Sequence, residues 1–162
     1  MYVKRSAEVA KKKRNNRRGE SMAKWPISRI RFEIARLDKI TGLNGQSLEI
    51  RIGKATQTLG SFESEKGKPK RFRFSAHFFE SDDFSHAAAI DTIRHEYSHY
   101  MVLMTYGRHP GGAHGNAWKK CCRRVGARPE RCYSEEWNQE MLSREKEIIE
   151  NWEYQPREKK EE

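Results

Sequence analysis

The sequence predicts an α+β domain in which an amphipathic helix precedes a small antiparallel three-stranded sheet, and further helices follow. Three observations predict this order. Apolar residues first recur at helical spacing between Ile27 and Leu37. They then alternate with polar residues in short segments, and after Ser85 they return to helical spacing. A chain of 162 residues suits one such domain with extensions.

The first helix and the sheet are delimited by their turn residues. Pro26 stands where the first helix is expected to begin, and Gly42 stands where it is expected to end. Alternation of apolar and polar residues predicts three short strands, at residues 47–54, 58–64 and 70–76. The turn chemistry of "EKGKP" separates the second strand from the third and predicts a tight reversal there.

The second half of the sequence predicts helices. One is expected from about Ser85 to Tyr106, ended by Gly107, and the next from about His114 to Val125. A last helix is expected to begin near Ser134, which is a suitable capping residue. Its predicted apolar stripe comprises Trp137, Met141, Ile148 and Trp152.

Charge is distributed unevenly and suggests three regions. The formal net charge is +10, yet residues 1–20 hold eight Lys/Arg against two Glu, and residues 135–162 hold five against ten acidic residues. We therefore expect a basic, disordered arm at 1–20, a folded domain at 21–134, and an acidic C-terminal helix and tail at 135–162. A basic body with a basic arm favours polyanionic partners, nucleic acid first; the alternative is a solvated tail.

The predicted compartment is the cytoplasm. There is no apolar run of membrane-spanning length, and the polar, basic N-terminus does not resemble a signal peptide, so no membrane partner is expected. The three cysteines are an odd number, and Cys121 adjoins Cys122. Neighbouring cysteines are poorly placed to bridge each other, which favours reduced thiols.

The motif with the most specific chemistry is "HEYSH", at residues 95–99. On a helix, His95 and His99 lie about one turn apart on one face, so both imidazoles can bind one Zn²⁺. Glu96 stands near that face, where a carboxylate can act as the general base on a zinc-bound water. A shuffled chain of this composition would contain the pattern about once in forty.

At 100° per residue, the main apolar stripe of this helix comprises Ile90, Ile93, Tyr97, Tyr100, Met101 and Met104. Both histidines lie on the other side, which is also fairly apolar, so we expect the helix to be buried on two sides. Two aligned histidines beside a glutamate favour a metal site over histidines that are buried in a core.

A catalytic zinc site needs a third protein ligand and an open fourth position. The candidates downstream are His109, His114 and the glutamates of the last helix, Glu135, Glu136 and Glu140. His114 shares a helical face with Trp118 and Cys121, which directs it inward, and the glycines of "RHPGGA" allow the chain to return toward His95. The spacing of metzincins would require a histidine where Thr105 stands, which excludes that class.

Taken with "HGNAWKKCCRRVGA" at 114–127, the sequence resembles the SprT-like family of zinc metallopeptidases, to which Spartan-type proteases belong. The resemblance covers about residues 27–134 and includes the order of the predicted elements, "SAHFFES" before the motif helix, and "PERCYS" after the third histidine. It implies a zincin-like fold, zinc bound by His95, His99 and His114, and Glu96 as the catalytic base. Spartan-like relatives digest proteins crosslinked to DNA. Unlike many members, this sequence shows no four-cysteine zinc ribbon and instead reaches an acidic helix.

Three functions are therefore compared. The first is a zinc metallopeptidase that hydrolyses peptide bonds in protein substrates, with DNA-associated proteins as possible substrates. DNA would be bound through the basic arm and through a basic helix face that carries Lys119, Lys120, Arg123 and Arg124. The second is a regulatory HExxH peptidase with a carboxylate as third ligand. The third is a non-enzymatic nucleic-acid-binding protein with structural zinc, against which Glu96 argues, because a structural site needs no base.

Overall fold

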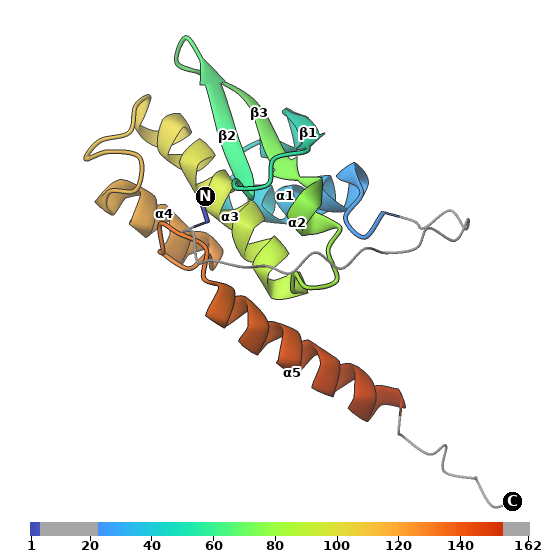
Figure 1. Cartoon of the computed structure of the whole chain (residues 1–162). Helices are drawn as coiled ribbons and strands as arrows, with labels where there is room; N and C mark the ends of the chain where they lie inside the picture. The colour runs from blue at the N-terminus through green and yellow to red at the C-terminus, as the bar shows by residue number, and fades with distance from the viewer. Residues whose placement is uncertain (4–22, 154–162) are drawn as a thin grey trace, which may run out of the picture.

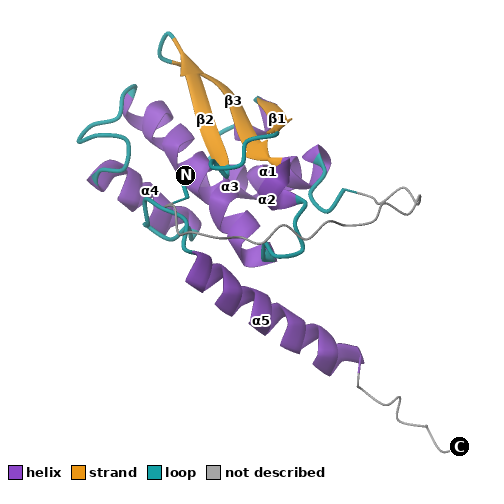
Figure 2. Cartoon of the chain, viewed as in Figure 1, coloured by secondary structure: helices purple, strands orange, loops and turns teal. Residues whose placement is uncertain are grey.

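A computed structural model of the chain describes residues 1–3 and 23–153 and has an α+β architecture (Figure 1). A three-stranded sheet lies against the central helix α3, and α5 extends away from the body of the molecule (Figures 1 and 2). In chain order the elements are α1 (Ile27–Thr41), a 3₁₀ turn η1 (Gly45–Ser47), β1 (Glu49–Gly53), β2 (Gly60–Glu65), β3 (Lys68–Ser75), α2 (Ala76–Phe79), α3 (His86–Tyr106), α4 (Asn116–Val125) and α5 (Glu135–Glu153).

The sheet is mixed, so the prediction of an antiparallel sheet was wrong for one of its two pairings. Strand β3 lies in the centre, antiparallel to β2 and parallel to β1. The β2–β3 reversal is a two-residue turn at Lys66 and Gly67, both with positive φ, as hairpin turns of the primed type require. The chain reverses direction between β1 and β2 and again between β2 and β3, so β1 and β3 run in the same direction. Because β3 lies between β1 and β2, β1 pairs with β3, and that pairing is parallel.

Helix α3 is buried on two sides, as its sequence predicted. On one side it packs against α1 and the sheet, where Tyr97 stacks on Phe72 with ring centroids 6.4 Å apart. The Tyr97 hydroxyl donates to Asp38 of α1 over 2.7 Å, and the same carboxylate accepts the backbone N–H groups of Gly45 and Gln46. A buried carboxylate with these partners fixes α1, the following turn and α3 to one another.

The opposite side of α3 packs against α4. The two residues of α4 that the sequence directed inward, Trp118 and Cys121, are buried, and so is Val125. All three cysteines are free, as expected. The last turn of α3 differs from the prediction, because Met104 is exposed rather than part of the buried stripe. The helix is longer than the layers that cover it, so its final turn emerges into solvent.

Helix α5 supplies part of the cap of α3. The Ser85 side chain accepts from Ala88 N–H, while the Glu145 carboxylate accepts from the N–H groups of His86 and Ala87 over 3.0 and 2.9 Å. The buried Asn138 side chain accepts from Ser85 N–H. Together these groups satisfy backbone donors that a helix start leaves without intrahelical partners. The acidic segment 135–153 is therefore joined to the fold at the N-terminus of α3.

Several predicted boundaries and surfaces need correction. Helix α4 begins at Asn116, so His114 lies in the preceding loop rather than in the helix. Ser134 does accept a hydrogen bond from Trp137 N–H at the start of α5. The predicted stripe of α5 is covered only in its first half, and Ile148 and Trp152 are exposed, the latter by 81 %. The two-layer body ends before that part of the helix.

The predicted basic arm and acidic tail fall mostly outside the described residues, at 4–22 and 154–162. Within the part of the chain that is described, no helix is both long and apolar enough to cross a membrane.

We expect Glu145→Ala to lower the free energy of unfolding by about 1–2 kcal/mol, because two charge-assisted bonds to α3 are lost. Urea denaturation followed by circular dichroism measures this. Glu147→Ala, which removes an exposed carboxylate from the same helix, is the matched control and should change the value by less than about 0.5 kcal/mol. Equal effects of the two substitutions would contradict the capping role.

Candidate metal centre

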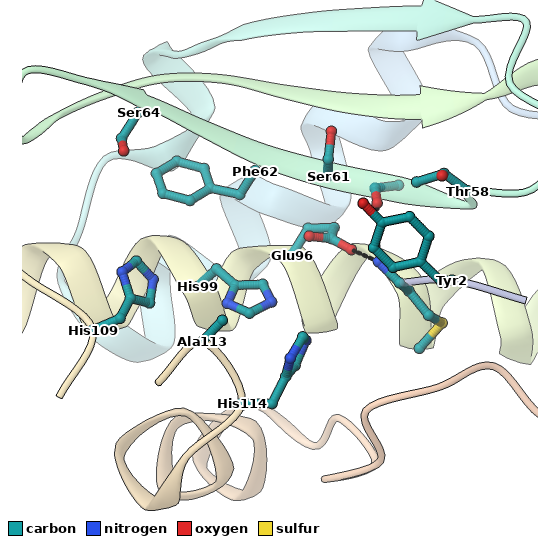
Figure 3. Close-up of a pocket in the computed structure, with 12 residues that line it drawn as sticks. Tyr2, Thr58, Ser61, Phe62, Ser64, Glu96, His99, His109, Ala113 and His114 are labelled. Carbon is teal, nitrogen blue, oxygen red and sulfur yellow. Dashed lines mark hydrogen bonds and ion pairs between the residues drawn. The ribbon is translucent and has the colours of Figure 1, made fainter. Parts of the chain in front are cut away.

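Three histidines converge beside α3. His95 and His99 belong to α3, and His114 comes from the loop that joins α3 to α4. Figure 3 shows two of them, His99 and His114, beside Glu96. One ligand nitrogen from each lies within 4.8 Å of the other two. Even at that largest separation on every side, a central point would lie about 2.8 Å from each nitrogen, close to the roughly 2.0–2.1 Å of a Zn–N bond. Small side-chain adjustments would therefore bring all three onto one ion.

The glycine-rich loop explains how His114 returns to the motif helix. Gly111 and Gly112 have φ values of 74° and 91°, a region that residues with a Cβ rarely adopt. Gly115 is closely approached by backbone, because a Cβ there would lie 2.5 Å from the Gly111 carbonyl oxygen. A side chain at 115 would therefore displace the loop next to His114. Tight chain reversal is the physical reason for Gly115 in the "HG" pair.

An indole forms the floor of the histidine cluster. The Trp118 ring lies 4.7 Å from the ring of His95 and 4.7 Å from that of His114, and it stacks on His99 with centroids 5.5 Å apart. Its Nε1–H donates to the His95 carbonyl over 3.4 Å. Because Trp118 is buried, it holds the imidazoles from the α4 side and excludes water there.

Burial keeps the imidazoles neutral. Desolvation, with smaller contributions from the Met1 ammonium and the neighbouring histidines, lowers the pKa of His95 to about 2. Desolvation is also the main cause that lowers the pKa of His99 to about 3, and it lowers the pKa of His114. A neutral imidazole offers a nitrogen lone pair, which is the form that binds metal ions.

Glu96 is buried next to the cluster. Its Oε1 lies 3.9 Å from His95 Nε2, and burial raises the pKa of the carboxyl group, while the Met1 ammonium and the Phe62 N–H act in the opposite direction. The start of β2 confines it, since a Cβ at Gly60 would lie 3.2 Å from Glu96 Cγ. The carboxylate is thus held at one position beside the three imidazoles.

A cavity of about 260 Å³ opens onto this site. It is bounded by the start of β2 on one side and the loop before α4 on the other, and its lining includes Gly60, Glu96, His99, His109 and His114 (Figure 3). An opening of this kind leaves room for a substrate next to the carboxylate.

His109 lines the cavity but does not belong to the three-histidine group. Its ring centroid lies 5.9 Å from that of His99. From the sequence, His109 was considered only as a candidate metal ligand. In the structure its ring lies beside the cluster and faces the cavity, where it can donate or accept a hydrogen bond. Its position just before the glycines that turn the chain back could have indicated this.

The glutamates considered as alternative ligands lie elsewhere. In the described part of the chain, the group of candidate ligands contains His114 and none of these carboxylates. Glu135 accepts hydrogen bonds from Tyr133 and Gln139, and Glu140 pairs with Arg144 on the same helix. The structure therefore brings the histidine, not a carboxylate of α5, to the HExxH pair.

The donor set fits a metal ion that prefers nitrogen ligands. His95 Nε2 and His114 Nε2 face each other 3.3 Å apart, and two nitrogens bound to one tetrahedral zinc ion would be separated by about 3.3 Å. Carboxylate-rich sites suit calcium or magnesium, whereas imidazoles suit zinc and other transition metals. His95 Nδ1 is buried with no hydrogen-bond partner among the described residues.

Comparison with known proteins agrees with this geometry. A family model described as the SprT-like family matches residues 21–141. No curated protein matches the chain significantly, and neither does any solved structure. The match spans most of the chain and contains the three histidines, Glu96 and the loop between them. The chain therefore belongs to the SprT-like family.

Proposed function

We propose that the protein is a zinc-dependent metallopeptidase that hydrolyses peptide bonds in protein substrates. The observation that carries the proposal is the convergence of His95, His99 and His114 beside the buried Glu96, at the edge of a cavity. Membership of the SprT-like family supports it. Three neutral imidazoles would hold the ion and leave a further position for water, as catalytic zinc sites require.

When bound, zinc would supply Lewis acidity to its water and to the scissile carbonyl. Glu96 takes a proton from the attacking water, and its raised pKa makes it a stronger base than an exposed carboxylate. The protonated Glu96 then delivers this proton to the nitrogen of the leaving amine. The confinement of Glu96 by Gly60 keeps it in reach of both partners.

A second hydrogen-bond donor to the developing oxyanion is useful in such a site. Tyr106, Arg108 and Tyr133 do not line the cavity that contains Glu96. Tyr133 instead donates to Glu135. His109 lies in the cavity wall and is the better candidate for this role.

The alternative functions have less support. A regulatory peptidase with a carboxylate ligand requires a glutamate of α5 in the cluster, where His114 lies instead. A purely structural zinc site does not require a cavity or a neighbouring base, and both are present. A cytoplasmic peptidase accords best with these features and with the free cysteines.

The proposal includes an association of the protein with DNA. On α4, Lys120, Arg123 and Arg124 are exposed and Lys119 is partly exposed, on the face opposite Trp118. The basic arm adds to this charge. Such a surface suits phosphate contacts without sequence preference, so the substrates are proposed to include DNA-associated proteins.

We expect His114→Ala to weaken zinc binding by more than about a hundredfold. Mutation of a residue that only hydrogen-bonds to a metal ligand already costs about 10–100-fold, and loss of a ligand itself should cost more. His109→Ala, the matched control in the same loop, should retain the ion. Competition with a fluorescent chelator measures both affinities. Retention of full affinity in His114→Ala would rule out His114 as a ligand.

We expect Glu96→Gln to retain zinc while peptide hydrolysis falls by about 10²–10⁴, because the amide cannot accept the proton. Casein cleavage together with metal analysis of the same sample checks this. Activity within a few-fold of the unchanged protein, or loss of the ion, would contradict the assigned role.

We expect the chain to bind single-stranded DNA at least as well as duplex, with an affinity that falls steeply as salt rises. Fluorescence anisotropy with labelled oligonucleotides measures binding by the full chain, by a chain beginning at Ser21, and by a variant with Lys119, Lys120, Arg123 and Arg124 changed to Glu. Loss of binding in either altered protein locates the contact. Absence of binding by the full chain at low salt would remove DNA from the proposal.

A further inference from the structure

A second cavity adjoins the one that contains Glu96. It has a volume of about 260 Å³ and is formed by the ends of β1 and β3, the start of β2 and the loop between β1 and β2. Thr58, Gly60 and Ser61 line both cavities. Residues 58–61 are therefore a wall, one strand thick, between the proposed catalytic site and this second space, which we call the outer cavity.

The outer cavity lies on the solvent-facing side of the sheet. Ser61 is the register partner of Arg73, and Phe62 is that of Phe72, which is fully buried. Because successive residues of a strand point to opposite faces, Ser61 and Arg73 share the face opposite the core. Figure 3 shows the Ser61 side chain directed away from Glu96. A ligand in the outer cavity would thus contact the wall from behind.

Several hydrogen-bond donors around the outer cavity are unused. Lys54 Nζ has no partner among the residues that the structure describes. Arg73 Nε pairs with Glu63 Oε1 over 3.1 Å, and the other oxygen of Glu63 faces Arg71 Nε over 3.4 Å. Within the described ranges, neither the terminal nitrogens of Arg73 nor the Ser61 hydroxyl makes a hydrogen bond. These donors are available to a ligand, because both oxygens of Glu63 are already engaged.

The sheet surface around the cavity carries an excess of positive charge. Three arginines share two carboxylates in a chain of ion pairs that runs Arg51, Glu49, Arg71, Glu63, Arg73. Lys54 adds a further cation at the cavity. Arg51 and Arg73 are direct register partners of the parallel strands β1 and β3, and like charges placed opposite each other repel. An added anion would relieve this repulsion.

The donors select a class of ligand. A guanidinium presents two parallel N–H groups that match the oxygens of a phosphate or a carboxylate, and an ammonium adds a point charge. With two cations and a hydroxyl to satisfy, a phosphate fits better than a carboxylate, because it offers three oxygens. The volume of about 260 Å³ lies just below the roughly 300–1,000 Å³ of most small-molecule sites, so the cavity suits a small molecule that carries a phosphate.

The wall couples the outer cavity to Glu96. A Cβ at Gly60 would lie 3.2 Å from Glu96 Cγ, 3.1 Å from Phe74 Cδ1 and 3.2 Å from the Arg73 carbonyl oxygen. Gly60 therefore packs against the proposed base and against the strand that carries Arg73. A ligand that joins Lys54 of the loop to Arg73 of β3 would restrain the wall, and a restrained wall holds Glu96 in its position.

We propose that the outer cavity binds the phosphate group of a small molecule through Lys54, Arg73 and Ser61, and that this ligand activates hydrolysis by restraining residues 58–61 against Glu96. The activation rests on the proposed peptidase function, whereas the binding does not. Coupling between two sites in a protein typically amounts to about 5–150-fold in affinity, which sets the scale of the expected effect.

Binding is tested on the zinc-free full chain, so that phosphate has no metal ion to bind. Inorganic phosphate is titrated at constant ionic strength, with chloride as the balancing anion, and backbone amide shifts are recorded by ¹H–¹⁵N NMR. We expect saturable shifts at Lys54, Gly60 and Ser61, half complete at about 1 mM or below. Shifts at these amides that do not saturate would overturn the proposal.

Matched substitutions locate the ligand. Lys54→Gln and Arg73→Lys should each weaken phosphate binding at least about fivefold, the first through the lost charge and the second through the lost guanidinium fork. Lys68→Gln removes an exposed lysine of β3 outside the outer cavity and should leave the affinity unchanged. Equal affinities of Lys54→Gln and the unchanged chain would refute the assigned site.

The same spectra identify the source of the phosphate group. Glycerol 3-phosphate should shift the amides of Lys54 and Ser61, whereas a single-stranded oligonucleotide without terminal phosphates should leave both unchanged. The reverse result would assign the cavity to the nucleic-acid backbone and overturn the small-molecule ligand.

The coupling to Glu96 has a structural and a catalytic readout. Saturating glycerol 3-phosphate should slow amide hydrogen exchange at Gly60 and Ser61 in the zinc-free chain. It should also raise kcat for casein about fivefold in the zinc-loaded chain. Neither effect should occur in Lys54→Gln. Unchanged exchange, or an active enzyme whose kcat does not respond, would contradict the activation.

The two proposals fail separately. Saturable shifts without any cleavage of casein would refute the peptidase and support the outer cavity as a binding site. Cleavage of casein without saturable shifts would refute the binding site and leave the peptidase standing.

Discussion

The burial of α3 on two sides is the constraint on which the structure depends. One side of the helix packs against α1 and the sheet through Tyr97 and Phe72, and the other packs against α4 through Trp118. A helix fixed by both neighbours cannot rotate, so the directions of its side chains are set. His95 and Glu96 are consecutive and therefore face two different elements, α4 and the start of β2. His95, His99 and Glu96 take their separate positions from this double burial.

The same burial produces the electrostatics of the site. Desolvation opposes every charged form, so the histidines remain neutral and available as ligands, while the Glu96 carboxyl group is a stronger base than in water. An anion in this environment attracts a positively charged partner. The Met1 ammonium meets that requirement, and a metal ion held by the three histidines would meet it as well.

Some residues that stabilise the fold or shape its turns also set the geometry of the site. Glu145 and Asn138 of α5 satisfy the first backbone donors of α3 and its preceding residue, although they lie far from the histidines along the chain. Gly115 permits the close backbone turn beside His114, and Gly60 permits the close approach of β2 to Glu96. These residues contribute no chemistry of their own. They determine whether the chemical groups lie within reach of one another.

The sequence by itself determined the α+β class, the long motif helix with its stop residue, and the HExxH pair, because these follow from local periodicity and from spacing along one helix. The predicted inward face with Trp118 and Cys121 also favoured His114 as the third ligand. Only the tertiary structure decided the parallel pairing of β1 with β3 and the position of Met1 beside Glu96. Both depend on contacts between segments far apart in the chain, and neither strand order nor the docking of a terminus leaves a periodic signal in the residues themselves.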